Sequence, residues 1–179
     1  KNHAAGGGSV ALGQENIAWG TTNFTSGFQN VAGDANAPVG SAGSATAMGT
    51  GTTASGRSSF SANNNTTASN QASAALGLST TADNFGMLAV GVNNSAGVGD
   101  TSIDPDNYGG YYYADGEYTG TPPGVAFVIG NGDVDSSNGL AGANPSNAFV
   151  VNFDGSATLS GDLTINSDAR LKSNIISLG

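Results

Sequence analysis

A repeat of glycine and asparagine is the feature that most limits what this chain can fold into. From Ser9 to Asn94 one of these two residues recurs every seven positions. Both tolerate a left-handed backbone better than other residues. The regular run of these anchors is Gly49, Gly56, Asn63, Asn70, Gly77, Asn84 and Gly91, and an earlier block contains Gly13, Gly20 and Gly27, with phase slips at Gly33 and Gly40.

The residues before each anchor show that the unit has fourteen residues in two unequal halves. Two positions before each anchor the side chain is small, as at Ala47, Ser61 and Ala75. The position directly before it alternates between apolar residues and Ser55, Ser69 and Asp83. A seven-residue period also occurs in coiled coils, but glycine, asparagine and β-branched residues are unfavourable there. The pattern predicts an all-β solenoid with two short strands per coil. About six coils, spaced by roughly 4.8 Å, give a block roughly 30 Å tall.

Three pentapeptides carry a resemblance to a known family: Ser9–Gly13 (SVALG), Ser73–Gly77 (SAALG) and Met87–Gly91 (MLAVG). With the repeat, residues 1–94 resemble the YadA-like head of trimeric autotransporter adhesins. This resemblance implies a left-handed parallel β-roll that is built from three chains.

A physical argument also favours a homotrimer. Each coil offers only a few large apolar side chains, such as Leu76 and Leu78, or Met87, Leu88 and Val90. These are too few to fill the core of a single chain. Three chains around a threefold axis can pool such faces into one core. We therefore expect a trimer, and a roll that is only marginally stable as a single chain.

The segment 95–124 interrupts the repeat and has a different composition. It combines acidic residues with all five tyrosines of the chain. Such loops make good recognition surfaces, because the ring offers a flat apolar face for a sugar and the hydroxyl forms hydrogen bonds. The alternative is a structural insertion that covers the end of the roll. The candidate receptor-binding residues are Tyr108, Tyr111, Tyr112, Tyr113 and Tyr118.

Residues 125–166 read as short strands. The apolar runs predict strands at Val125–Ile129, Ala148–Phe153, Ala157–Leu159 and Asp162–Ile165. Asp154-Gly155 between two of these runs predicts a hairpin. Such hairpins resemble the collar that joins a fibre shaft to a C-terminal chaperone, which implies an intertwined trimeric β-prism.

The string from Ser167 to Ile175 is the most specific signal in the chain. It resembles the start of the intramolecular chaperone domain of phage tailspikes and tail fibres of the endosialidase type. The family signature is Ser-Asp-x-Arg-x-Lys followed by an apolar residue, which here is matched by Ser167, Asp168, Arg170, Lys172 and Ile175. The resemblance implies a domain that holds three chains together during folding and then cuts itself off between Asn166 and Ser167.

The same resemblance implies roles for individual side chains of segment 167–179. Ser167 is the expected nucleophile and Lys172 the base, with Asp168 and Arg170 as supporting charges. A partly desolvated lysine can lose its proton near neutral pH and accept one from a hydroxyl. Locally, Ser167 or Asp168 also reads as the N-cap of a short helix. Chaperones of this type are much longer than this segment, so we expect the chain to be a fragment.

Composition excludes several classes of partner. The net charge is −9, and the only basic residues are Lys1, Arg57, Arg170 and Lys172. Binding to double-stranded nucleic acid or to an anionic membrane surface needs far more basic side chains. Without cysteine there are no disulfides and no zinc–cysteine sites. No apolar run is long enough to cross a bilayer, so no membrane insertion is expected in this fragment.

No cofactor and no metal ligand are predicted. Asp104 and Asp106, and likewise Asp133 and Asp135, have a spacing that suits calcium. Neither pair has the glycine and distal glutamate of an EF-hand loop, so solvated turn acids are the favoured interpretation. The single histidine, His3, is expected at a frayed end. Nothing in residues 2–166 resembles a turnover enzyme.

The resulting hypothesis is a trimeric tail-fibre or surface attachment protein that binds a receptor, with a glycan as the favoured class. Its location is extracellular, on a phage-like particle or a bacterial surface. The alternatives are a bacterial surface adhesin and a passive fibre spacer. Ice binding is a further alternative, because paired threonines recur every fourteen residues and would form a ladder on a solenoid. These pairs are Thr52-Thr53, Thr66-Thr67 and Thr80-Thr81.

Overall fold

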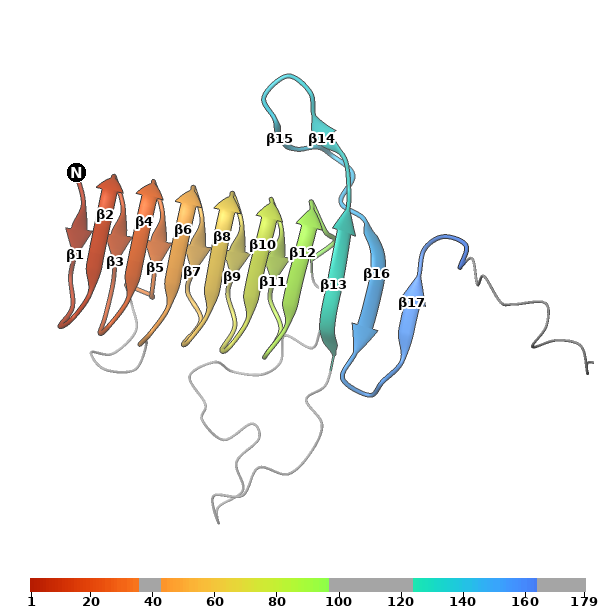
Figure 1. Cartoon of the computed structure of the whole chain (residues 1–179), viewed down its shortest axis with the longest axis horizontal. Coiled ribbons are helices and arrows are strands. Elements are labelled where there is room, and N and C mark those ends of the chain that lie inside the picture. The colour runs from red at the N-terminus through yellow and green to blue at the C-terminus, as the bar shows by residue number, and fades with distance from the viewer. Residues whose placement is uncertain (36–42, 97–123, 164–179) are drawn as a thin grey trace, which may run out of the picture.

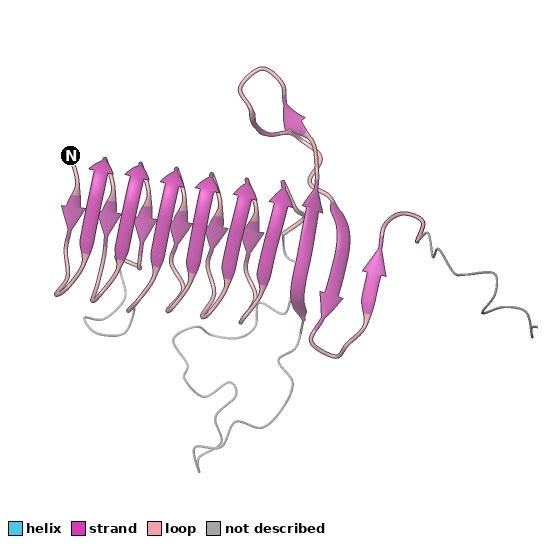
Figure 2. Cartoon of the chain, in the orientation of Figure 1, coloured by secondary structure: helices cyan, strands magenta, loops and turns pink. Residues whose placement is uncertain are grey.

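The chain forms a parallel β-solenoid of about six coils that ends in an antiparallel extension (Figure 1). The computed structural model describes residues 1–35, 43–96 and 124–163. Within these ranges every regular element is a strand, which confirms the predicted all-β solenoid (Figure 2). These ranges accordingly contain no helix long and apolar enough to cross a membrane. The helical start predicted for residues 167–179 lies outside the described residues.

Each coil consists of one two-residue strand and one five-residue strand. The short strands form a six-stranded sheet: β1 (His3–Ala4), β3 (Ile17–Ala18), β5 (Val31–Ala32), β7 (Thr53–Ala54), β9 (Thr67–Ala68) and β11 (Thr81–Ala82). The long strands start a nine-stranded sheet: β2 (Val10–Gln14), β4 (Phe24–Phe28), β6 (Thr46–Thr50), β8 (Phe60–Asn64), β10 (Ala74–Leu78) and β12 (Leu88–Val92).

The register between coils is almost constant. Ala74 pairs with Phe60 on one side and with Leu88 on the other, an offset of fourteen residues in both directions. The offset differs between β4 and β6, where Phe24 pairs with Thr46, and 46 − 24 = 22. Eight additional residues (22 − 14) therefore lie within this coil. The phase slip that the sequence shows at Gly33 and Gly40 reflects this insertion.

The interior between the two sheets is narrow and takes only small side chains. Ala54, Ala68 and Ala82 of the short strands are fully buried. Opposite them, Ala47, Ser61 and Ala75 of the long strands are buried to the same extent. These are the small residues found two positions before each anchor, so this column of the sequence pattern marks the inward-facing positions. Among the described residues, the larger buried apolar side chains, Met87, Val125 and Val128, lie at the last coils.

A column of amides and hydroxyls runs through the interior at the turn from each long strand to the next short strand. The Oδ1 atom of Asn16 accepts hydrogen bonds from the backbone N–H and the side-chain amide of Asn30, both at 3.0 Å. Asn30 in turn accepts from the backbone N–H of Thr52 at 2.9 Å and from its hydroxyl at 2.8 Å. Buried polar groups need such partners. The column thus ties successive coils together from inside.

The early anchors Gly13, Gly20 and Gly27 are left-handed as predicted, but in the regular run from Gly49 to Gly91 the prediction holds in one half of the repeat only. Gly49, Gly77, Gly91 and Asn63 have positive φ, whereas the alternate anchors Gly56, Asn70 and Asn84 do not. In that half the left-handed residues lie two positions later, at Ser58, Ala72 and Gly86. The reason is a hydrogen bond between coils: the N–H of Ala72 donates to the carbonyl of Arg57 at 2.9 Å. Tertiary pairing here overrides the local preference of the residue.

The C-terminal part changes the sheet from parallel to antiparallel. Strand β13 (Val125–Asn131) still pairs in parallel with β12, and β16 (Asn147–Asn152) and β17 (Ala157–Leu159) then add antiparallel strands. The predicted Asp154-Gly155 hairpin is confirmed between β16 and β17, with Gly155 at φ +86°. A small hairpin of β14 (Val134–Asp135) and β15 (Leu140–Ala141) was not predicted. Of the strand predicted at Asp162–Ile165, the first two residues are not in a strand and the others lie outside the described residues.

We predict that Gly77→Ala destabilises the solenoid. A Cβ atom at Gly77 would lie 2.0 Å from the carbonyl oxygen of Gly91, and its φ of +122° is strained for any L-residue. We expect a loss of about 2 kcal/mol or more, measured as a lower midpoint of urea unfolding. Gly7→Ala is the matched control, because a Cβ atom at Gly7 meets nothing within 4 Å. Equal stability of the two variants would contradict the close stacking at Gly77.

Candidate interaction surfaces

The catalytic and receptor-binding residues predicted from sequence lie outside the described part of the chain. This holds for the tyrosines of the insertion, Tyr108, Tyr111, Tyr112, Tyr113 and Tyr118, and for Ser167, Asp168, Arg170 and Lys172 of the terminal string. The surfaces that the structure does describe are the two faces of the solenoid, its two turn edges and the C-terminal hairpins.

The outer face of the nine-stranded sheet carries most of the large apolar side chains of the solenoid. In each long strand the second residue points inward, so the first and the third point outward. No charged residue occupies either outward position in β2, β4, β6, β8, β10, β12 or the aligned part of β13. Leu12 is 52% exposed and Met48 41%. We call the following residues the outer apolar face: Val10, Leu12, Phe24, Met48, Phe60, Leu76, Leu88, Val90, Phe127, Ile129, Phe149, Val151 and Leu159.

This face runs without interruption from the solenoid into the antiparallel extension. The register places Leu76 beside Val90, and Val90 beside Ile129. Ile129 pairs with Phe149, and Phe149 pairs with Leu159 of the last strand. The rings of Phe127 and Phe149 meet edge to face with centroids 6.4 Å apart. Directly paired residues lie on the same side of a sheet, so the solenoid and the extension share one apolar surface.

Sequence reasoning found only part of this face. It named Leu76, Leu78, Leu88 and Val90 as apolar residues for a shared core, and the structure places Leu76, Leu88 and Val90 on the outer face. Met87 was named with them but is fully buried within its own chain. The first coils and the extension were missed. The signal for them was the order large, small, large in Val10-Ala11-Leu12, which puts the small residue inside.

The opposite face, on the six-stranded sheet, is narrow and mostly uncharged. Its outward column contains Ile17, Val31, Thr53, Thr67 and Thr81. The first threonine of each predicted pair does not reach this surface, because Thr52, Thr66 and Thr80 are fully buried. An ice-binding array on this face would therefore have one threonine per coil. On the described part of this face the only threonine array available for ice binding is thus the single column of Thr53, Thr67 and Thr81.

His3 is not at a frayed end as predicted. It lies in β1, where its backbone N–H donates to the carbonyl of Asn16 at 2.9 Å. Its ring meets the indole of Trp19 edge to face, with centroids 5.2 Å apart. The pairing of β1 with β3 fixes this end of the solenoid.

The acidic residues near the β14–β15 hairpin hold turns together. The carboxylate of Asp133 accepts from the backbone N–H of Asn144 at 2.9 Å and from its side-chain amide at 2.8 Å. Asp135 accepts from the backbone N–H and the hydroxyl of Ser137. Hydrogen bonds from Asn144 lower the pKa of Asp133, and those from Ser137 lower the pKa of Asp135. Among the described residues no three His, Cys, Asp or Glu side chains gather as metal ligands do.

We predict that protonation of Asp133 loosens the β14–β15 hairpin. Since its pKa is lowered in the folded state, its contribution is fully present above the ordinary pKa of aspartate, about 3.9, and is lost as the pH falls through the lower folded value. Hydrogen exchange of the Gly142 N–H, which donates to the Asp133 carbonyl at 3.0 Å, should report this loss. Asp133→Asn should exchange faster at neutral pH and depend less on pH. The same pH dependence in both proteins would contradict this role.

Comparison of the chain with family models, with curated proteins and with solved structures found no match. The resemblances to a YadA-like head and to a self-cleaving chaperone therefore stay predictions from the sequence.

Proposed function

We propose that this chain is one protomer of a homotrimeric attachment fibre that binds a receptor on a cell or other surface. The observation that carries the proposal is the inverted distribution of side chains. Apart from Met87, Val125 and Val128 at the last coils, the described interior is filled with alanine, serine, threonine and asparagine, while leucine, methionine, valine and phenylalanine form the outer apolar face. Continuous exposed apolar surfaces of this kind mark sites of protein association.

A second copy of the same chain is the best partner for this face. The face is a sheet surface without charges at its outward positions, and it repeats with every coil, so an equally regular surface complements it. Closed assemblies of identical chains are the commonest way to bury such a surface. The outer apolar face alone does not distinguish a dimer from a trimer. The number three rests on the resemblance of the repeat to YadA-like heads and of the terminal string to trimer-holding chaperones.

The attachment role rests on the same resemblances together with the elongated form of the solenoid. The proposed location is extracellular, on a phage-like particle or a bacterial surface. A glycan is the proposed receptor class, with the tyrosines of residues 97–123 as candidate contacts. A chaperone that starts at Ser167 would hold the chains during folding and then release itself after Asn166, with Lys172 as the base. A passive spacer would have the same outer apolar face but no receptor.

We predict that Leu76→Asp prevents trimer formation. Leu76 lies in the middle of the outer apolar face, and burial of an unpaired carboxylate in each of three copies costs several kcal/mol per ion. Light scattering during size-exclusion chromatography should give three chain masses for the unaltered protein and a lower mass for the variant. Thr67→Asp, on the opposite sheet, is the control and should stay trimeric. A monomeric unaltered protein would refute the proposal. A dimer would support the outer apolar face as the interface and would refute the trimer.

We predict that the chain, expressed with its natural downstream sequence, is cut between Asn166 and Ser167. Intact-mass measurement should find the shortened fibre in the unaltered protein and the full length in Ser167→Ala. Lys172→Ala should also remain uncut, because the serine would lack its base. Uncut protein in all three cases would show that the string does not act as a self-cleaving chaperone here.

A further inference from the structure

The two turn edges of the solenoid differ in the length of their turns. The turn from a long strand to the next short strand has two residues in each regular coil, such as residues 15–16, 65–66 and 79–80. The turn from a short strand to the next long strand has five residues, as in residues 55–59 and 69–73. We call the latter the wide edge. Its coils are joined by hydrogen bonds from Ser58 to Gly43, from Ala72 to Arg57 and from Gly86 to Gln71.

Both interruptions of the repeat fall on the wide edge. The eight additional residues of the first interruption lie between β5 and β6, a short and a long strand. In the second, Leu88 pairs with Phe127, and 127 − 88 − 14 leaves 25 additional residues. These follow the turn at Asn93 and Asn94, since the N–H of Asn93 still donates to Leu78 as in a regular coil. Insertions in repeat proteins collect on one face, which is often the binding face.

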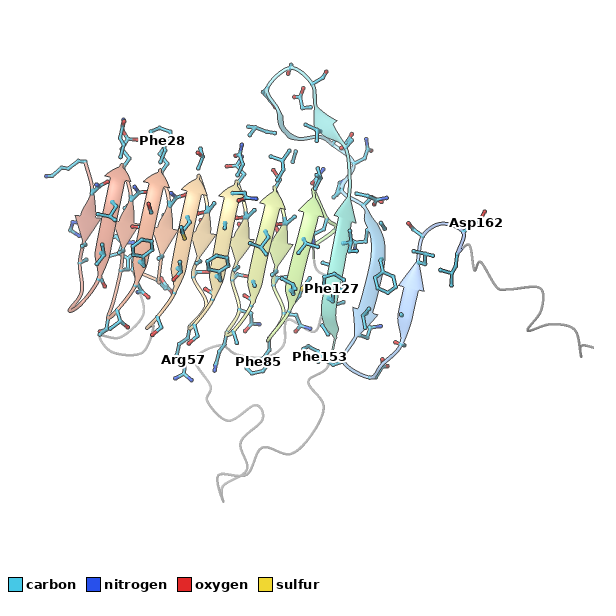
Figure 3. All side chains as sticks on the ribbon, in the orientation of Figure 1. Phe28, Arg57, Phe85, Phe127, Phe153 and Asp162 are labelled. Atoms are coloured by element: carbon cyan, nitrogen blue, oxygen red, sulfur yellow. The ribbon has the colours of Figure 1, made fainter. Side chains whose placement is uncertain are left out.

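The side chains of the wide edge change between these two interruptions. At the equivalent position of successive coils the first three residues are Gly7, Thr21 and Gly43, and the next three are Arg57, Gln71 and Phe85. In the next coil this position is Gly124, and Phe153 lies beside it with its ring 3.5 Å from where a Cβ atom of Gly86 would be. Its N–H donates to the carbonyl of Gly124, which ends the second interruption. Figure 3 shows Arg57, Phe85 and Phe153 along this edge.

The backbone hydrogen bonds of the turn form whichever side chain occupies this position. The carbonyls of Arg57 and Gln71 accept the hydrogen bonds of the ladder, and the carbonyls of Gly7 and Gly43 do the same without any side chain. All four side chains of the row are half-exposed. Arg57, Gln71 and Phe85 follow one another at intervals of one coil, roughly 4.8 Å, and with Phe153 they offer two aromatic faces next to an amide and a guanidinium. This is the chemistry that a sugar ring with its hydroxyls requires.

We propose that Arg57, Gln71, Phe85 and Phe153 form a carbohydrate-binding strip on the wide edge. The ligand is a neutral oligosaccharide, because a chain with a net charge of −9 repels polyanionic glycans. Phe85 and Phe153 contact the apolar faces of sugar rings, and Gln71 and Arg57 donate hydrogen bonds to their hydroxyls. This inference rests on the proposed attachment function and names its ligand class and its described contact residues.

The test is binding of the full-length fibre to immobilised gluco-, galacto- and manno-oligosaccharides, with oligogalacturonate as the acidic counterpart. We expect binding to at least one neutral oligosaccharide, with little change when the salt concentration is raised. Phe85→Leu should weaken this binding about tenfold, because it removes the aromatic face, and Phe85→Tyr should retain it. Gln71→Ala should also weaken binding and disturbs no packing of the interior. Thr21→Ala, at the same position outside the strip, should bind normally.

Three results would overturn the inference. These are a trimer that binds none of the neutral oligosaccharides, tighter binding to oligogalacturonate, and unchanged binding by both Phe85→Leu and Gln71→Ala. The mass of each protein in solution is measured in parallel. A fibre that forms trimers and fails to bind these sugars refutes the strip alone, whereas a chain that forms no oligomer refutes the proposed function as well.

Discussion

The width of the interior is the constraint on which the rest of the structure depends. A coil of fourteen residues brings its two strands so close that only small side chains fit between them, and Ala54, Ala68 and Ala82 are fully buried there. Glycines of the long strands approach the next coil even more closely. A Cβ atom at Gly49 would lie 2.0 Å from the carbonyl oxygen of Asn63. Large apolar side chains are buried inside only at the last described coils, at Met87, Val125 and Val128, and most of the others lie on the outer sheet.

Hydrogen bonds between coils therefore replace much of what a wide apolar core does in other folds. The backbone ladders of both sheets, the ladders of both turn edges and the inner column from Asn16 to Thr52 all run along the same axis. Each coil is thus held mainly by its two neighbours, as in other repeat proteins. The outer apolar face stays exposed in the single chain, and we propose that association of identical chains buries it.

The period of the repeat predicted the solenoid and its number of coils, since these follow directly from residue spacing. The inward positions coincide with the small residues two positions before each anchor, but the sequence analysis did not assign them to the interior. Local preference failed where contacts between coils decide the backbone. Gly56 and Asn70 were expected to be left-handed. Instead Ser58 and Ala72 are left-handed, because their N–H groups donate to the previous coil.

The β14–β15 hairpin was missed, since its two-residue strands leave almost no sequence pattern. The wide-edge strip was missed because Arg57, Gln71 and Phe85 share a position but no residue type. The tyrosines of the insertion and the string that starts at Ser167 lie outside the described residues. The roles assigned to them therefore rest on the sequence alone.

Because regular coils are offset by fourteen residues, the number of coils sets the length of the solenoid. Each coil adds about 4.8 Å to the length and leaves the faces of its neighbours in register. Gain or loss of one whole coil would move the antiparallel extension along the axis without turning any side chain from one face to another. Insertion of one residue within a strand would turn the rest of that strand over, whereas the wide edge accepts eight or 25 additional residues and leaves the faces of the next strand unchanged. The length of the solenoid can therefore vary in whole coils while its chemistry stays the same.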